Sequence, residues 1–166
     1  MNWGALKSAV ATFANRTDLT DQMTNFRDLA EQRIFNGDET NRISPLRHPR
    51  MLSLATLTPS SGVAALPSDY LEVKRLTSEI GGRTYSLHYR SPYLFGQYAL
   101  ISGTPEFFTV RGSNVVLGPS FTSVISLYYY ARPATPSADS DENWIMSAAP
   151  SLYLYGMLAD VGLFLR

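Results

Sequence analysis

The sequence predicts an α+β fold, with helices at both ends of the chain and antiparallel strands between them. Three observations support this class. Apolar residues recur at helical spacing up to residue 40, the period changes from 3.6 to 2 after residue 50, and helical spacing returns from Pro150. Helices and strands are therefore segregated along the chain, which argues against an alternating βαβ arrangement with a parallel sheet.

Residues 1–40 predict a pair of helices joined by a short turn. Each helix carries a stripe of apolar residues on one face, threonine and aspartate cap oxygens precede the second, and Gly37 ends it. The first stripe comprises Trp3, Leu6, Val10 and Phe13, and the second comprises Leu19, Met23, Phe26, Ala30 and Ile34.

Residues 41–50 predict an irregular basic connector, because Pro45 and Pro49 interrupt it. A local cluster of positive charge can contact phosphate or an acidic partner, and it can also be a solvated linker. Its basic side chains are Arg42, Arg47, His48 and Arg50.

Residues 51–132 predict an antiparallel β-sandwich or barrel-like section that contains one short helix. The clearest strand is RTYSLHYR at 83–90, where apolar and polar side chains alternate. Gly81-Gly82 before it and Gly112-Ser113-Asn114 after it suit hairpin turns. The expected segments are strands at 51–57, 70–76 and 83–90, a helix at 91–100 begun by Ser91 and Pro92, a hairpin over 106–119 and a long strand over 121–132.

Three consecutive tyrosines lie in the strand over 121–132. With a period of two, Tyr129 points inward, whereas Tyr128 and Tyr130 lie on the opposite face. The outer face of such a strand is usually polar, so these two rings are expected to be covered by the protein's own helices or by a neighbouring subunit. A stacking platform for a carbohydrate or nucleotide is a third interpretation, since rings offer flat apolar faces.

Residues 133–149 predict a polar loop, and residues 150–166 predict a C-terminal helix that packs back on the helical pair. This helix is apolar nearly all round. A helix with two apolar faces must be covered on both, and the body of so small a domain covers only one. We therefore expect the stripe of Tyr153, Met157 and Phe164 to contact a partner.

The composition favours a subunit whose surface is partly covered by neighbours. Charged residues make up 17% of the chain, against about 25% in ordinary domains. The formal net charge is zero, so no global field attracts nucleic acid. The sequence has no signal peptide and no run long enough to span a membrane, so we expect a soluble protein made in a cytoplasm.

No catalytic, cofactor-binding or metal-binding set emerges from the sequence, and we expect no enzyme. The absence of cysteine excludes disulfides and thiolate chemistry, and His48 and His88 have no metal-ligand spacing. Phosphate-binding loops and nucleophile motifs are also missing. The carboxylates Asp139, Asp141 and Glu142 lie in a serine-rich segment typical of a solvated loop, where a raised catalytic pKa is not expected.

Three stretches resemble the head-to-tail adaptor (connector) proteins of tailed bacteriophages, and the helix–β–helix layout is similar to podoviral tail tubular proteins. The resemblance runs through residues 66–165 in its motifs and extends to the N-terminal helices in pattern. Members of that family usually continue past the last helix with a charged helical tail, whereas this sequence ends at Arg166. The matching stretches are LPSDYLEVKRL (66–76), GTPEFFTVRGSNVVLGP (103–119) and LYYYARPATPSADSDENWIMSAAPSLYLYGMLADVGLFL (127–165).

The resemblance implies a single adaptor domain over residues 1–166 that forms a ring of identical subunits, usually twelve, below the portal. The implied partners are further copies of the chain, the portal protein, a tail or nozzle protein, and the genome DNA, which passes without sequence-specific binding. The implied location is the head–tail interface of a virion assembled in the host cytoplasm. The residues expected to contact partners are Tyr128, Tyr130, Tyr153, Met157, Phe164, Arg42, Arg47 and Arg50.

Two alternatives use other chemistry. A carbohydrate-binding β-sandwich module of a phage tail would use Tyr128, Tyr130 and Trp144 as its platform. A small hydrolase would work through Asp139 and Asp141. The adaptor interpretation needs neither a sugar nor a catalytic carboxylate.

Overall fold

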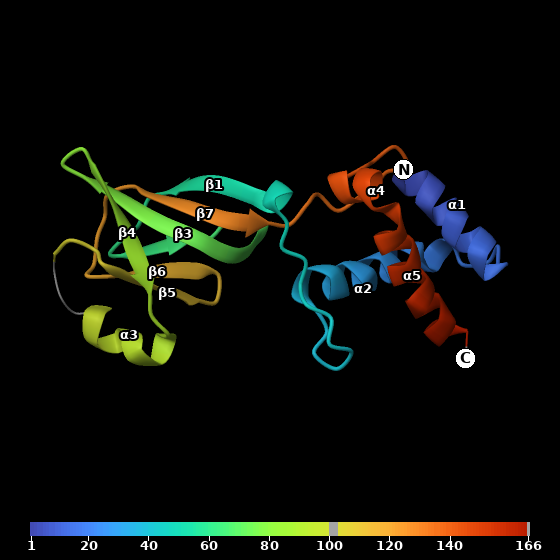
Figure 1. The fold of residues 1–166 in the computed structure, drawn as a ribbon, viewed down its shortest axis with the longest axis horizontal. Helices are drawn as coiled ribbons and strands as arrows, with labels where there is room; N and C mark the ends of the chain where they lie inside the picture. The colour runs from blue at the N-terminus through green and yellow to red at the C-terminus, as the bar shows by residue number, and fades with distance from the viewer. Residues whose placement is uncertain (100–102, 166) are drawn as a thin grey trace. The chain divides into compact units, whose positions relative to one another are not determined.

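The computed structural model describes residues 1–99 and 103–165, which form two compact units (Figure 1). The helical unit comprises Met1–Arg47 and Pro133–Arg166, and the β unit comprises His48–Arg132. The β unit is therefore an insertion between the two parts of the helical unit. The predicted α+β class is confirmed. That residues 1–166 act as a single adaptor domain stays a prediction.

The helical unit is built from capped helices. The Asn2 side chain accepts a hydrogen bond from the Ala5 amide at the first helix, and Gly37, with φ of 76°, ends the second. The predicted polar loop over 133–149 contains a short helix that Asn143 caps. The elements are α1 (Trp3–Ala14), the 3₁₀ turn η1 (Thr20–Gln22), α2 (Met23–Asn36), α4 (Trp144–Ala148) and α5 (Pro150–Phe164).

The C-terminal helix packs on the N-terminal pair, as predicted. Helix α5 lies against α2 and α1 (Figure 1). Gly156 allows the close approach to α2, because a Cβ atom at this position would lie 3.1 Å from the Cβ of Ala30. The core of this unit includes Trp3, Leu6, Val10, Leu19, Met23, Phe26, Phe35, Ile145, Met146, Tyr153, Met157 and Val161.

The β unit is a curled sheet in the form of a half-barrel, with strand order β1-β7-β3-β4-β5-β6-β2. Its core side is lined by residues from six of the strands, among them Leu76, Leu127 and Phe108. The elements are the 3₁₀ turn η2 (Pro49–Met51), β1 (Leu52–Leu57), β2 (Val63–Ala65), β3 (Tyr70–Ile80), β4 (Arg83–Tyr89), α3 (Pro92–Ala99), β5 (Phe107–Arg111), β6 (Asn114–Gly118) and β7 (Ile125–Ala131).

The sheet differs from the predicted antiparallel section in one pairing. Strands β4 and β5 run parallel, with α3 in the connection between them, whereas the remaining neighbours are antiparallel. A parallel pair needs a crossover, and the predicted short helix supplies it. Its last predicted residue, 100, lies outside the described residues. The turns at Gly81-Gly82 and at Gly112-Ser113 occur as predicted.

Two further features of the sheet differ from the sequence-based predictions, namely the presence of β2 and the start of β7. Strand β2, only three residues long, was not predicted, because its side chains lie in a Ser- and Pro-rich tract without clear alternation. Its pairing with β6 is a long-range contact. Strand β7 begins at Ile125, four residues after the predicted start.

Candidate docking surfaces

The outer side of the sheet carries a patch of exposed apolar side chains on β1 and β7. Leu52 pairs with Tyr130 and Leu54 pairs with Tyr128 in the antiparallel register. Tyr128 is 42% exposed and Leu54 is 56% exposed, whereas Tyr129, between the two outer tyrosines, is buried. We refer to the exposed Leu52, Leu54 and Tyr128, together with the half-buried Tyr130, as the β1–β7 face.

The β1–β7 face has the properties of a protein contact. Strand β1 (LSLATL) has no charged residue and forms one edge of the sheet. Natural edge strands usually carry charges or prolines that prevent pairing with other chains, so an uncharged apolar edge marks a contact surface. Tyr128 is exposed, so no other part of the β unit covers it.

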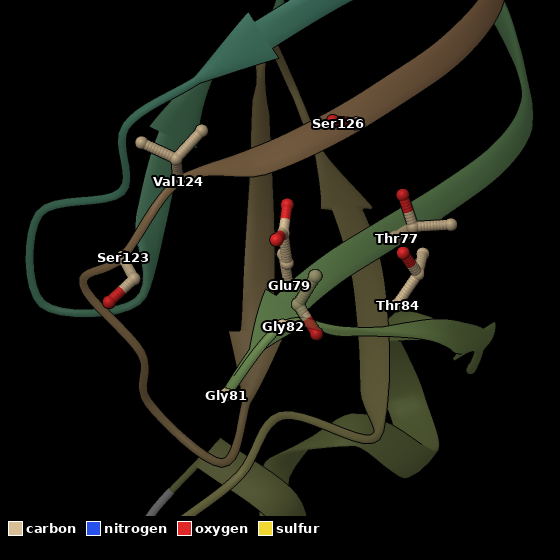
Figure 2. A pocket seen from close by; sticks show the side chains of 9 residues that line it. Thr77, Glu79, Gly81, Gly82, Thr84, Ser123, Val124 and Ser126 are labelled. Atoms are coloured by element: carbon tan, nitrogen blue, oxygen red, sulfur yellow. The ribbon is translucent and has the colours of Figure 1, made fainter.

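A polar hollow lies where β3, β4 and β7 meet (Figure 2). Its volume is about 420 Å³, and Figure 2 shows the Glu79 side chain between Thr77 and Thr84 on one side and Ser123 and Val124 on the other. Hydroxyl groups around one carboxylate suit a polar or cationic group. Among the described residues, no group of three or more His, Cys, Asp or Glu side chains is placed to hold a metal ion.

Tyr153 and Met157 do not lie on the surface, which corrects the prediction for these two residues. Both side chains have an exposed fraction of 0% and form part of the core of the helical unit. A side chain with no accessible surface cannot contact a partner. The sequence pattern indicated that α5 is apolar on more than one face, but of the predicted stripe only Phe164 is exposed.

Tyr153 instead holds a buried polar network together. Its hydroxyl donates to Glu31 Oε1 at 2.9 Å and accepts from Asn143 Nδ2 at 3.0 Å. The second oxygen of Glu31 accepts from Thr135 Oγ1 at 2.7 Å. Burial, followed by the charge of Glu31, raises the pKa of Tyr153 above its ordinary value, so the ring stays neutral and keeps its proton for this bond.

The outward face of α5 is apolar as well. Leu152 is 38% exposed, Tyr155 is 62% exposed and Leu163 is 64% exposed. Their spacing of three and eight residues places them along one side of the helix. This stripe could have been found in the sequence, because α5 contains more apolar residues than one buried face requires.

An apolar groove of about 660 Å³ runs beside this stripe in the helical unit. Its lining is largely apolar, and Arg33 is the charged residue in it. We refer to it as the α5 groove. Its lining comes from α2, from residues 43–46 and from α5, and it includes Ile34, Ile43, Leu46, Leu152 and Tyr155.

Phe164 lies at the end of α5, where the structure leaves it accessible. Its side chain is 57% exposed, and one part of the ring contacts Phe26 edge-on, with centroids 5.7 Å apart. The Phe164 side chain is therefore accessible to a partner, and the contact itself stays a prediction.

The residues of the basic connector are divided between the two units. Arg47 belongs to the helical unit, where its guanidinium donates to the carbonyl oxygens of Phe35 and Leu46. Arg50 belongs to the β unit and lies in η2. Arg42 is exposed in a turn closed by a bridge between Asp38 and Ile43. Partner contacts at the three arginines stay predictions.

The acidic loop has a structural role at the start of α1. The carbonyl oxygens of Asp139 and Asp141 accept from the Gly4 and Trp3 amides, and Lys7 contacts the Asp139 carboxylate at 2.6 Å. Backbone amides of Ser137 and the following residue lower the pKa of Asp141 below its ordinary value. A carboxylate held in its ionised form by these amides is a turn cap, not a general acid.

Comparison with known proteins identifies the family of this chain. No described helix is long and apolar enough to cross a membrane. No curated protein matches the chain. The model of the SU10 adaptor protein family matches residues 1–166, the full sequence. The chain therefore belongs to the SU10 adaptor protein family and is a bacteriophage adaptor, a component of the virion.

Proposed function

We propose that this adaptor forms a ring of identical subunits, twelve in number, between the portal and the tail of a phage particle. One side of the ring binds the portal protein and the other binds a tail or nozzle protein. The genome DNA passes through the channel without sequence-specific contacts. The ring is assembled in the host cytoplasm and acts at the head–tail interface.

The observation that carries this proposal is the doubly apolar helix α5. Its buried face completes the helical unit, whereas Leu152, Tyr155 and Leu163 remain exposed beside the α5 groove. Exposed apolar stripes of this size are uncommon in a monomer and typical of a protein interface. A second copy of the chain is the occupant that a closed ring requires, because each copy must offer its neighbour the same pair of surfaces.

The remaining surfaces supply further contacts. We assign Tyr128 and the half-buried Tyr130 of the β1–β7 face to contacts between protein subunits, since tyrosines are frequent anchors of such interfaces. Phe164 extends the exposed end of α5. Arg42, Arg47 and Arg50 are assigned to the portal or channel side, where positive charge meets acidic groups or phosphate.

The proposed role is structural and not enzymatic. Asp139 and Asp141 are tied to the start of α1 and are not placed around a dry cavity. For the carbohydrate alternative, the three rings of the predicted platform fall in different units. Tyr128 and Tyr130 belong to the β unit and Trp144 to the helical unit. No observation favours a joint sugar site for them.

The test is to place charge on the outward face of α5. The variant Leu152→Asp/Tyr155→Asp should fold, because both side chains are exposed, but should form no rings in negative-stain images with purified portal. Particles of an adaptor-deleted phage complemented with this variant should lack tails. The matched control is Leu29→Asp/Phe13→Asp, which places the same charge on exposed apolar residues of α2 and α1 outside the groove lining.

The control should assemble as the wild type does. Normal rings and infectious particles from the Leu152/Tyr155 variant would refute the assigned interface. Particles that assemble without any adaptor ring would refute the proposed function itself.

A further inference from the structure

The most exposed aromatic side chain of the β unit lies on α3. Tyr93 is 93% exposed, and its neighbour Leu94 is 55% exposed. Tyr89, at the end of β4, is 52% exposed. Arginines 90 and 111 flank these residues, and we define Tyr89, Arg90, Tyr93, Leu94 and Arg111 as the β4–α3 lobe.

The lobe is held firmly by the opposite side of α3. Phe95 has an exposed fraction of 0%, and the Tyr98 ring lies 4.4 Å from that of Phe107. Gly118 allows this approach, since a Cβ atom there would lie 2.9 Å from the Phe95 ring. Because α3 is anchored in this way, the backbone at Tyr93 is held in place and the exposed ring is accessible to a partner.

The arginines of the lobe are also held in position. The Arg90 guanidinium lies 4.8 Å from the centre of the Phe107 ring, and that of Arg111 lies 5.7 Å from the Phe95 ring. Arg111 Nη2 also donates to the Pro92 carbonyl oxygen at 3.5 Å. The lobe is therefore an apolar and aromatic tip with a cationic rim, a combination typical of protein–protein hot spots.

The net charge of the chain is zero, but its two units carry opposite formal charges. The β unit has seven Lys and Arg residues against four Asp and Glu, a formal charge of +3. The helical unit has seven against ten, a formal charge of −3. Each copy therefore contains a basic unit and an acidic unit, which suits a head-to-tail contact between copies.

Ion pairs within the helical unit remove equal numbers of positive and negative charges, so its formal charge stays −3. Arg33 is bound to buried Asp160, and buried Arg27 donates to the Pro136 carbonyl oxygen and to Asp28. Acidic side chains, by contrast, are mostly at the surface. Asp21, Asp28, Glu39, Asp139 and Glu142 are exposed, and three of them form ion pairs: Asp28 with Arg27, Asp139 with Lys7 and Glu142 with the N-terminal amine.

We propose that the β4–α3 lobe of one copy docks on the acidic surface of the helical unit of a second copy. This inference rests on the proposed ring and names one of its contacts. Each copy would present a basic lobe to one neighbour and an acidic surface to the other. A protein partner fits better than nucleic acid, because the tip residues Tyr93 and Leu94 are uncharged and both arginines already lie over aromatic rings.

The first test is a photo-crosslink from position 93. The variant Tyr93→p-benzoylphenylalanine, prepared as an equal mixture of ¹⁴N- and ¹⁵N-labelled full-length chains, is assembled into particles and irradiated. We expect mixed-isotope crosslinks to peptides of residues 1–47 or 133–166. Crosslinks to β-unit peptides, to DNA or to another virion protein, or no crosslink in normal particles, would overturn the docking model. The ring would still be visible in those particles, so the proposed function would stand.

The second test distinguishes the contribution of the lobe itself from a general effect of the charge of the β unit. The variant Arg90→Glu/Arg111→Glu should weaken self-association in sedimentation equilibrium about tenfold at low salt, with a smaller effect at high salt. Lys74→Glu/Arg83→Glu changes the same charge on exposed residues outside the lobe and should have a small effect. Tyr93→Ser should weaken association about tenfold or more at any salt concentration. Equal effects of the two charge variants, or an unchanged Tyr93→Ser, would overturn the proposal.

Discussion

The ion pair between Arg33 and Asp160 allows a quantitative test of how α5 is fixed on α2. Arg33 Nη1 donates to Asp160 Oδ1 at 2.7 Å and Nη2 donates to Oδ2 at 2.5 Å. The two side chains differ in burial, since that of Asp160 is 6% exposed and that of Arg33 is 28% exposed. Replacing Arg33 and replacing Asp160 should therefore lower the free energy of unfolding by different amounts.

Arg33→Met leaves the Asp160 carboxylate buried without a counter-charge, which should cost about 3–5 kcal/mol of unfolding free energy. Asp160→Asn leaves an arginine that can reach water and still donates to the Gly156 carbonyl oxygen at 2.8 Å. That variant should cost about 1–2 kcal/mol. The double variant Arg33→Met/Asp160→Leu removes both charges and should be more stable than Arg33→Met alone.

The measurement is urea unfolding followed by tryptophan fluorescence. Both tryptophans, Trp3 and Trp144, lie in the helical unit, so the signal reports on this unit. The matched control is Arg42→Met, the same change at an exposed arginine. Its free energy of unfolding should lie within about 0.5 kcal/mol of the wild-type value. A loss from Asp160→Asn as large as that from Arg33→Met would refute the reasoning from unequal burial.

Three further outcomes follow from the helical unit. Tyr153→Phe removes the donor to buried Glu31 and should cost about 2 kcal/mol in the same urea assay; an unchanged midpoint would contradict the network. Asp141→Asn should destabilise the protein near neutral pH. The lowered pKa of Asp141 means that its stabilising effect is present at neutral pH and is lost as the pH falls through that lowered value, so thermal midpoints of variant and wild type should converge in acid. Gly156→Leu should cost about 1–3 kcal/mol by forcing α5 away from Ala30, and the smaller Gly156→Ala should cost less.

Local patterns predicted much of the fold. The apolar stripes identified α1, α2 and α5, and Gly37 ends α2 as expected. The alternation in β7 correctly placed Tyr129 inside and Tyr128 outside. These features depend on neighbouring residues, whose spacing determines which face is apolar.

The errors concern contacts between residues far apart in the sequence. Helix α5 has two apolar stripes, and no local signal tells which one faces α2. The face of α5 that is buried is the one that carries Gly156, which packs on Ala30, and Asp160, which pairs with Arg33. The parallel pairing of β4 with β5 and the three-residue β2 are likewise determined by their partners in the sheet.

The position of the β unit within the chain has a consequence for biosynthesis. Its residues, His48–Arg132, form one continuous segment, whereas the helical unit needs both Met1–Arg47 and Pro133–Arg166. On the ribosome the β unit can therefore be complete while α1 and α2 still lack the helix that covers their apolar faces. The proposed contact through α5 is available only after α5 has been translated, which is later than the β unit.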